Sequence, residues 1–350
     1  MIRSIFPLFF ASLLLLSLCS CFASGESNPD TTNSTERLAA QAGSGGGANS
    51  DLGELKPLPD IQYPEDQMVQ LEREYEVLIG EGVYRRFQEL VYADGQGNVA
   101  MELIGLAEDR EQPFQNPSAL EQMYYDLRQR YLLRYRDVHL RDESRFRQNY
   151  GMEELPGTVT LAGRSCRQHV AHSRHGFGDV HFFIDESTDL LLGWSIFDPE
   201  GVETARLRTT AVDFQPNFSG VTWSQPLIPE QPYRGAVDDA ALGFTPKHAI
   251  YRPNGFFPES TMMLLGQVFT NDLPNIHFEV NHDGLRVLFI AQHPSEQQQS
   301  KIGPNQIIVE AQSSRIGGIS VLEATRDQIH LYIVGAVSQD EEATILGSIY

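Results

Sequence analysis

The sequence has few residues of the kinds that form covalent or metal cross-links. Only three cysteines occur in 350 residues, Cys19, Cys21 and Cys166. This number excludes both a disulfide framework and a four-cysteine zinc site. Lysine is nearly absent, because 23 of the 26 basic residues are arginine. The chain therefore has little material for lysine-based covalent chemistry, and we interpret Cys166 as a buried apolar thiol.

Positive charge is also scarce. The chain has 47 acidic and 26 basic residues and a formal net charge of −21. A surface of this sign repels phosphate backbones, which argues against sequence-independent binding of nucleic acid. With 41% hydrophobic and 21% charged residues the composition is that of a globular protein, and the length suits two domains.

After the first 20 residues no apolar run is long enough to span a bilayer. Residues 5–18 form a short apolar stretch behind Arg3, which predicts a signal peptide over residues 1–20. Residues 18–21 are similar to a bacterial lipobox, so we expect lipidation of Cys21 and an anchor at a membrane surface. The alternative is cleavage after Ala23, which would release a soluble exported protein. Either outcome predicts export from the cytoplasm, and the location that we expect is the periplasmic side of the cell envelope.

Residues 21–59 are rich in Ser, Gly, Asn and Thr, with a glycine run at residues 43–47. Such a composition buries too little apolar surface to offset the entropy of ordering the chain, so it predicts a flexible tether. The glycine run does not form a phosphate loop, because no strand precedes it and no helix follows it.

Residues 60–214 have the pattern of a domain made mostly of strands. We expect a helix beginning at Pro64, with a stripe of Met68, Leu71, Tyr75 and Leu78, and a second helix over 118–135 that Ser118 and Glu121 cap. Strands are predicted at 83–92, 98–106, 157–170, 178–184, 190–197 and 202–214. Successive hairpins of this kind make an antiparallel meander, whose predicted inward residues are Phe182, Ile184, Leu190, Leu192, Trp194 and Ile196.

A linker is predicted over residues 215–242, which contain four prolines and little periodic pattern. The second domain, residues 243–350, is predicted to have strands at 262–270, 276–282, 285–292, 306–312, 317–324 and 328–335, and a terminal helix over 338–348. Neither domain alternates strands with helices as nucleotide-binding α/β folds do, so the fold class is α+β.

No motif of enzymatic chemistry occurs in a fitting context. The sequence has no serine elbow, no His-Glu-x-x-His helix and no phosphate loop, so we expect a protein without catalytic activity or cofactor. Four histidines lie close together, at 169, 172, 175 and 181. They are distributed over a strand, a turn and the next strand, and alternation places His169 and His172 on opposite faces, which argues against a shared metal site.

Arginine is concentrated in one segment. Residues 128–147 contain seven arginines and three acidic residues. One interpretation is a solvated helix face with acidic partners one turn away. The other is a rim that pairs with carboxylates or phosphates of a partner. The candidates for that rim are Arg128, Arg130, Arg134 and Arg136.

Several short motifs resemble the MucB/RseB family of periplasmic regulators. In the first domain they are residues 162–166, 183–190 and 198–201, and in the second they are residues 252–256, 282–285, 317–318 and 333–335. The resemblance covers about residues 83–350, and turn residues dominate it. Arg252 departs from the family, which has an aliphatic residue before the proline, and the long tether is additional.

The resemblance implies a first domain like the LolA/LolB carriers, a half-open antiparallel β-barrel with a helical lid, and a smaller C-terminal α/β domain with an antiparallel sheet. It implies a protein that senses lipidated or amphipathic ligands and binds an anti-sigma-type membrane protein. Candidate residues of the ligand cavity are Phe87, Met101, Leu103, Phe182, Ile184, Trp194 and Ile196. Two alternatives stay open: a carrier or receptor for lipoproteins or lipids, and an envelope scaffold whose barrel is packed shut.

Overall fold

The computed structural model describes residues 58–80, 82–126, 132–224, 230–232, 239–264, 275–294, 310–316 and 318–349. The expected signal peptide, Cys21 and all but the last two residues of the expected tether lie outside these ranges. Among the residues described, no helix is long and apolar enough to cross a membrane.

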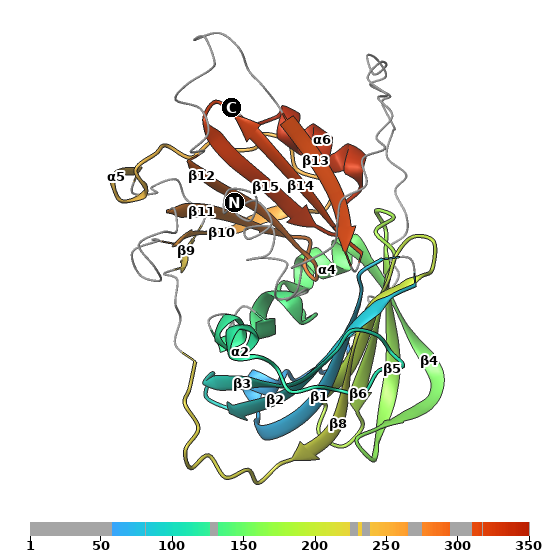
Figure 1. Cartoon of the computed structure of the whole chain (residues 1–350). Coiled ribbons are helices and arrows are strands. Elements are labelled where there is room, and N and C mark those ends of the chain that lie inside the picture. The colour runs from blue at the N-terminus through green and yellow to red at the C-terminus, as the bar shows by residue number, and fades with distance from the viewer. Residues whose placement is uncertain are drawn as a thin grey trace.

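The first domain is one curved sheet of eight antiparallel strands (Figure 1). The strands are β1 (Met68–Leu78), β2 (Tyr84–Asp94), β3 (Val99–Ala107), β4 (Tyr150–Leu161), β5 (Arg164–Ser173), β6 (Asp179–Asp185), β7 (Leu191–Phe197) and β8 (Glu203–Asp213). Their order is β3-β2-β1-β8-β7-β6-β5-β4. The long-range pairing of β1 with β8 joins the early and late hairpins into one sheet. The edge strands β3 and β4 are not paired with each other among the described residues, so this sheet is open.

The helix predicted from Pro64 is wrong. Only a short 3-10 turn, η1 (Pro64–Asp66), precedes strand β1. The predicted stripe included Met68, which is 54% exposed, whereas the buried side chains alternate along the strand: Val69, Leu71, Arg73, Tyr75 and Val77. Two-residue alternation is the pattern of a strand, and β1 pairs with β2 on one side and β8 on the other.

The single strand predicted over residues 157–170 is also wrong. A tight turn at Ala162 and Gly163 divides this segment into β4 and β5. Both turn residues have positive φ, at 50° and 73°, as a two-residue hairpin turn of the type matched to strand twist requires. The sequence signal was weak because alanine is an uncommon residue in the left-handed region.

Three short helical segments lie between the two sheets: α2 (Ala119–Asp126), a π-helical turn η2 (Leu132–Arg136) and α4 (Glu143–Asn149) (Figure 1). The predicted helix start is confirmed, since Ser118 N–H donates to the Glu121 carboxylate at 2.6 Å and Glu121 N–H donates to Ser118 Oγ at 3.3 Å. Residues 127–131 of the predicted helix lie outside the described residues.

The second sheet has seven antiparallel strands. They are β9 (Glu230–Pro232), β10 (Phe257–Leu264), β11 (Ile276–His282), β12 (Val287–Pro294), β13 (Glu310–Ile316), β14 (Ile319–Arg326) and β15 (Ile329–Gly335). Two helices accompany them, α5 (Asp239–Leu242) and α6 (Gln339–Gly347). The strand order is β13-β14-β15-β12-β11-β10-β9. Strand β9 lies inside the range expected to be a linker and pairs with β10, so the second sheet begins before residue 243. Both faces of β11 are buried.

Helix α6 covers one face of the second sheet. Ser338 caps it by accepting a hydrogen bond from the backbone N–H of Glu341, and Ile345 and Leu346 pack against Leu288, Ile290 and Leu331. The same helix buries the Glu342 carboxyl, which accepts a hydrogen bond from Ser313 Oγ at 3.0 Å. Burial raises the pKa of Glu342 to about 7, although its serine contacts act in the opposite direction.

The raised pKa of Glu342 makes stability depend on pH. Because its folded pKa lies above that of the unfolded chain, its contribution is present below about pH 4.5 and is lost as the pH rises through 7. We expect the wild-type protein to lose about 2 kcal/mol from this group between pH 5 and pH 8. The Glu342→Gln variant should lose about 2 kcal/mol less over that interval, as urea unfolding at both pH values would measure. Equal losses in the two proteins would contradict this assignment.

Candidate functional site

A row of large side chains crosses the inner face of the first sheet. Six strands contribute one residue each at matching register positions, in the order Phe87, Tyr75, Leu207, Trp194, Phe182 and His169. The ring of Tyr75 lies 5.7 Å from that of Phe87 and 5.9 Å from that of Trp194. All six side chains are buried. The row is therefore the apolar wall that the helical segments cover.

The seven candidate cavity residues all lie in or against one core cluster. Phe87, Met101, Leu103, Phe182, Ile184 and Trp194 are each at most 3% exposed, and Ile196 packs against them partly buried. The structure therefore brings these residues together. Their part in ligand binding stays a prediction.

Buried charges lie within this interior, which the sequence patterns did not indicate. Arg73 of β1 donates to Glu89 Oε2 of β2 at 2.9 Å and to Asp137 Oδ2 at 2.7 Å. Arg136 donates to both carboxylate oxygens of Glu89 and, from Nε, to Asp137 Oδ1 at 2.8 Å. We call Arg73, Glu89, Arg136 and Asp137 the interior charge cluster. It has two charges of each sign, so it needs no further counter-ion.

The cluster holds Glu89 ionised. Burial of this carboxyl, which has no exposed surface, would raise its pKa, but the guanidinium groups of Arg136 and Arg73 outweigh that effect and lower the pKa to about 2. The Arg136 guanidinium also lies 4.2 Å from the centroid of the Tyr75 ring. The cluster thus fastens η2 and Asp137 to strands β1 and β2.

The predicted arginine rim is divided by the structure. Arg136 points into the interior with a side chain only 4% exposed, so we no longer assign it to partner binding. Arg134 is 49% exposed, and its guanidinium lies 3.9 Å from Glu259 of β10. Arg128 and Arg130 lie outside the described residues. The signal that would have found the interior charge cluster is the two-residue alternation of β1, which places Arg73 between Leu71 and Tyr75 on one face.

Little space is left between the row and the helical segments at this point. A cavity of about 20 Å³ is lined by Arg73, Leu133, Asp137, Val138, Trp194 and other residues. Such a volume holds one water molecule, whereas pockets for small-molecule ligands enclose about 300–1,000 Å³. An apolar chain does not fit into this cavity unless lining side chains such as Leu133 and Val138 move.

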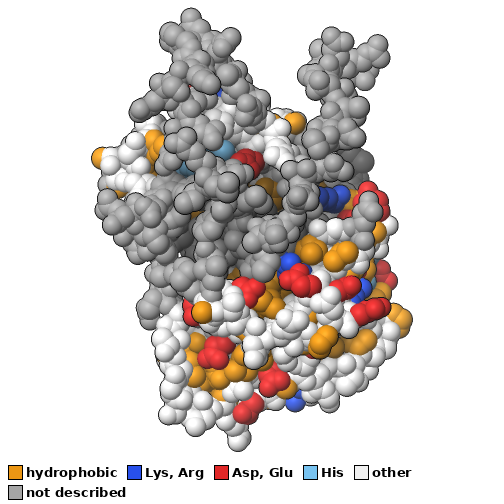
Figure 2. Space-filling model, viewed as in Figure 1, with side chains coloured by type: hydrophobic (Ala, Val, Ile, Leu, Met, Phe, Trp, Pro, Cys, Tyr) orange, Lys and Arg blue, Asp and Glu red, His pale blue; other side chains and the backbone are white. Residues whose placement is uncertain are grey.

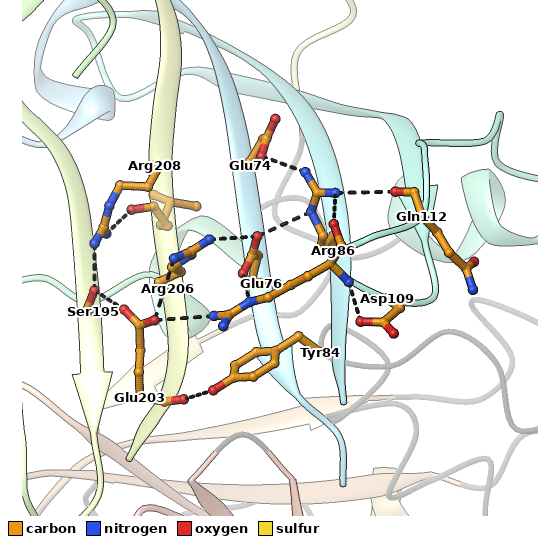
Figure 3. Close-up of polar contacts among 12 residues, drawn as sticks. Glu74, Glu76, Tyr84, Arg86, Asp109, Gln112, Ser195, Glu203, Arg206 and Arg208 are labelled. Carbon is orange, nitrogen blue, oxygen red and sulfur yellow. Dashed lines mark hydrogen bonds and ion pairs between the residues drawn. The ribbon is translucent and has the colours of Figure 1, made fainter. Parts of the chain in front are cut away.

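A second polar network covers the outer face of the same strands (Figure 3). Glu76 is its centre and pairs with Arg110 Nε at 2.8 Å and with Arg206 at 3.0 Å. Burial acts to raise the pKa of Glu76, and the hydrogen bonds from these two arginines bring it below the ordinary value. Acidic side chains with few basic ones are spread over the first domain in Figure 2. The network thus neutralises part of an acidic surface by ion pairs across β1, β2 and β8.

The prediction that His169 and His172 lie on opposite faces of their strand is confirmed. His169 belongs to the inner row and is buried. His172 is 48% exposed and lies 3.5 Å from Glu153 and 3.1 Å from Asp179. His169 is therefore a core residue of β5 and lies away from the solvated end of the hairpin.

The two domains meet in a buried polar interface. Tyr150 Oη donates to Asp283 Oδ2 at 2.5 Å, and Asn149 Nδ2 donates to the carbonyls of Asp283 at 2.7 Å and Gly255 at 3.0 Å. The ring nitrogen of His175 lies 2.9 Å from Asn149 Oδ1. Burial, and then the Asp283 carboxylate, raise the pKa of Tyr150 well above its ordinary value.

Apolar contacts continue across this interface. The ring of Tyr135 meets that of Phe289 edge-on at 5.4 Å. One core cluster includes residues of both sheets, among them Phe146 and Tyr150 from the first domain and Phe278, Phe289 and Tyr332 from the second. The two sheets therefore pack as one body around the helical segments (Figure 1).

The fold is mainly antiparallel sheet with few helices, arranged as a curved sheet that is packed against a second one through short helical segments. No family model and no curated protein matches this sequence. Among solved structures, the chain is similar to the crystal structure of MucB in complex with MucA(peri), with a TM-score of 0.50 and 15% identity over 82% of this chain and 94% of that one. The Pseudomonas aeruginosa MucA/MucB complex matches with a TM-score of 0.44 and 13% identity over 82% and 94%.

The predicted likeness to MucB is thus confirmed at the level of the fold. A match over 82% of 350 residues is longer than either domain alone, so it includes both sheets.

Proposed function

We propose that this protein is a non-enzymatic binding protein of the bacterial cell envelope that holds a segment of a membrane-protein partner of the anti-sigma type. The observation that carries the proposal is the fold shared with MucB, a protein solved in complex with MucA(peri), over 94% of the MucB chain. We further propose that the protein is on the periplasmic side and that a lipid on Cys21 anchors it, with residues 22–59 as the tether.

The packing of the two domains supports a binding role. A partner segment that lies against both domains needs them in a fixed relative position, because each loose element must be ordered at an entropic cost when the partner binds. The Tyr150–Asp283 and Asn149–Asp283 hydrogen bonds supply such a fixed arrangement before any partner is present.

The ligand part of the proposal concerns the first sheet. We propose that this sheet and its helical segments correspond to a half-open barrel with a lid, and that the seven cavity candidates contact an amphipathic or lipidated ligand when the lid moves. A lipid carrier is the second candidate function, but a constitutive carrier needs an accessible slot. The small cavity beside Trp194 supports a protein in which ligand entry at this place is coupled to a rearrangement of the residues that line it.

Affinity purification of the mature full-length chain from its native envelope, with cross-linking and mass spectrometry, tests the proposed function. We expect enrichment of a membrane protein with an exported segment, and direct binding of that purified segment to the chain in solution. A Tyr150→Phe, Asp283→Asn variant, which loosens the domain interface, should bind the segment more weakly than the wild type. Co-purification of lipids or lipoproteins alone would favour the carrier, and recovery of neither class would favour a scaffold.

A further inference from the structure

One segment takes part in both the interior of the first sheet and the contact with the second. Residues 132–146, which we call the strap, begin at η2 and extend into α4. On its inner side Leu133 and Val138 line the cavity beside Trp194, and Arg136 and Asp137 complete the interior charge cluster. These four side chains therefore lie against the row near Tyr75 and Trp194.

The outer side of the strap contacts the second domain. Tyr135 packs edge-on against Phe289, and the backbone N–H of Arg141 donates to the carbonyl of Gly284 at 2.9 Å. The Arg145 guanidinium lies 3.2 Å from the centroid of the Phe257 ring. These three contacts reach β10, β12 and the turn before β12 from residues between 135 and 145, and Asn149 and Tyr150 bind the same turn from beyond the strap.

Residues of the strap that contact the first sheet alternate with residues that contact the second domain. They lie so close together in the sequence that one set of contacts cannot be broken without the other. Tyr135 stands between Leu133 and Arg136, and the backbone hydrogen bond from Asp137 N–H to the Leu132 carbonyl, at 3.0 Å, closes this turn. A movement that withdraws Leu133 and Val138 from the row must also shift Tyr135 from Phe289. Packed interiors respond to such displacement by switching between discrete arrangements.

We propose that the strap couples occupation of the first-sheet interior to release of the second domain. An apolar chain, such as the acyl chain of an amphiphile, enters only when the strap leaves the row, and the same departure breaks the contacts with β10 and β12. The inference rests on the proposed function for its ligand class, and it adds the element that transmits binding. Coupling of this kind is reciprocal, so loosening either side loosens the other.

Mutation tests the coupling without any ligand. Phe289→Ala removes the contact of the second domain with Tyr135, and the matched control Leu288→Ala truncates the adjacent residue of β12, which packs on the α6 side. We expect Phe289→Ala to raise hydrogen exchange of the Asp137 amide about tenfold. In a Trp223→Phe background it should also shift the emission of Trp194 to the red. Leu288→Ala should leave both readouts unchanged. Equal strap exchange in the two variants would overturn the proposal.

The ligand arm uses dodecylphosphocholine monomers below their micelle concentration as the probe. We expect the probe to raise hydrogen exchange at residues 282–286, and the Asp137→Asn variant to bind it about five- to tenfold more tightly, because its strap is held less firmly. Probe binding with unchanged exchange at residues 282–286 would overturn the coupling. If Phe289→Ala loosens the strap but no probe binds, the coupling stands and the ligand class of the proposed function fails.

Discussion

Replacing Glu89 by glutamine should lower the free energy of unfolding by about 3–5 kcal/mol, the range found when one partner of a buried ion pair is removed. The carboxylate is fully buried and neutralises parts of two guanidinium groups, those of Arg73 and Arg136. Glutamine keeps the size of the side chain but leaves the cluster with an excess positive charge in a buried site. The cost is therefore electrostatic and does not depend on a change of packing volume.

Urea unfolding followed by the fluorescence of Trp194 in a Trp223→Phe background would measure this loss, since Trp194 lies in the same interior. The matched control is Glu74→Gln on the outer face of β1, whose side chain is 30% exposed and pairs with Arg86 at 3.1 Å. An exposed pair of this kind contributes at most about 1 kcal/mol. A loss below about 1 kcal/mol for Glu89→Gln would mean that the cluster does not hold the interior together.

The same residue predicts the behaviour in acid. Its folded pKa of about 2 lies below the ordinary value of 4.5. Its contribution is thus present above pH 4.5 and is lost as the pH falls towards 2. The difference in stability between wild type and Glu89→Gln should therefore shrink over that interval. Glu342 in the second domain has a raised pKa, so its contribution to stability is lost as the pH rises through about 7. The pH ranges in which the two variants differ from the wild type therefore distinguish the group in the first domain from the group in the second.

The positions of most strands follow from local patterns in the sequence. Hairpin turns with Asp-Gly pairs, such as Asp94-Gly95 and Asp283-Gly284, separate segments whose alternation is clear, and the predicted strands fall within a few residues of the observed ones in most cases. The pairing of β1 with β8 has no local signal, because it joins residues more than 120 positions apart. The strand β1 was predicted as a helix for this reason. Some of its apolar residues are spaced three or four apart, as on a helix face, and nothing in the local sequence indicates its distant partner strand.

The interior charge cluster was missed for a related reason. Arg136 lies in a segment with seven arginines, which by composition resembles a solvated surface. Its burial depends on Glu89, 47 residues earlier in the chain, and on Asp137 beside it. The alternation of β1 indicates that Arg73 is buried, but its partners are far away in the sequence, whereas the capping residues Ser118 and Ser338 have their partners three residues away.

The turn motifs that carried the family resemblance have a structural role that the sequence did not reveal. Two of them, residues 252–256 and 282–285, belong to the part of the second domain that meets the first. Gly255 packs against Asn149, and a side chain at Gly284 would overlap the backbone of Phe146. The positions in these motifs are thus required for close approach of the domains, in addition to the geometry of the turns themselves.

Substituting alanine for Gly284 should therefore cost more than a turn glycine usually does. Gly284 has φ of +103°, and a Cβ atom there would lie 2.8 Å from Phe146 Cα, inside the contact distance of two carbon atoms. Backbone strain contributes about 1 kcal/mol and the forced separation of α4 from the turn contributes about 1–3 kcal/mol more.

Gly220→Ala is the matched control, because Gly220 has φ of +88° but no atom within 4 Å of the added Cβ. It should show the strain alone, with unchanged packing of the domains. Gly284→Ala should in addition increase the radius of gyration in solution scattering and raise hydrogen exchange at the Arg141 amide, which donates to the Gly284 carbonyl. If the two variants lose equal stability and keep the same radius of gyration, Gly284 is required only for the backbone conformation of its turn. The contact with Phe146 would then have no role in fixing the position of the second domain, and a partner that needs both domains would have to order them itself.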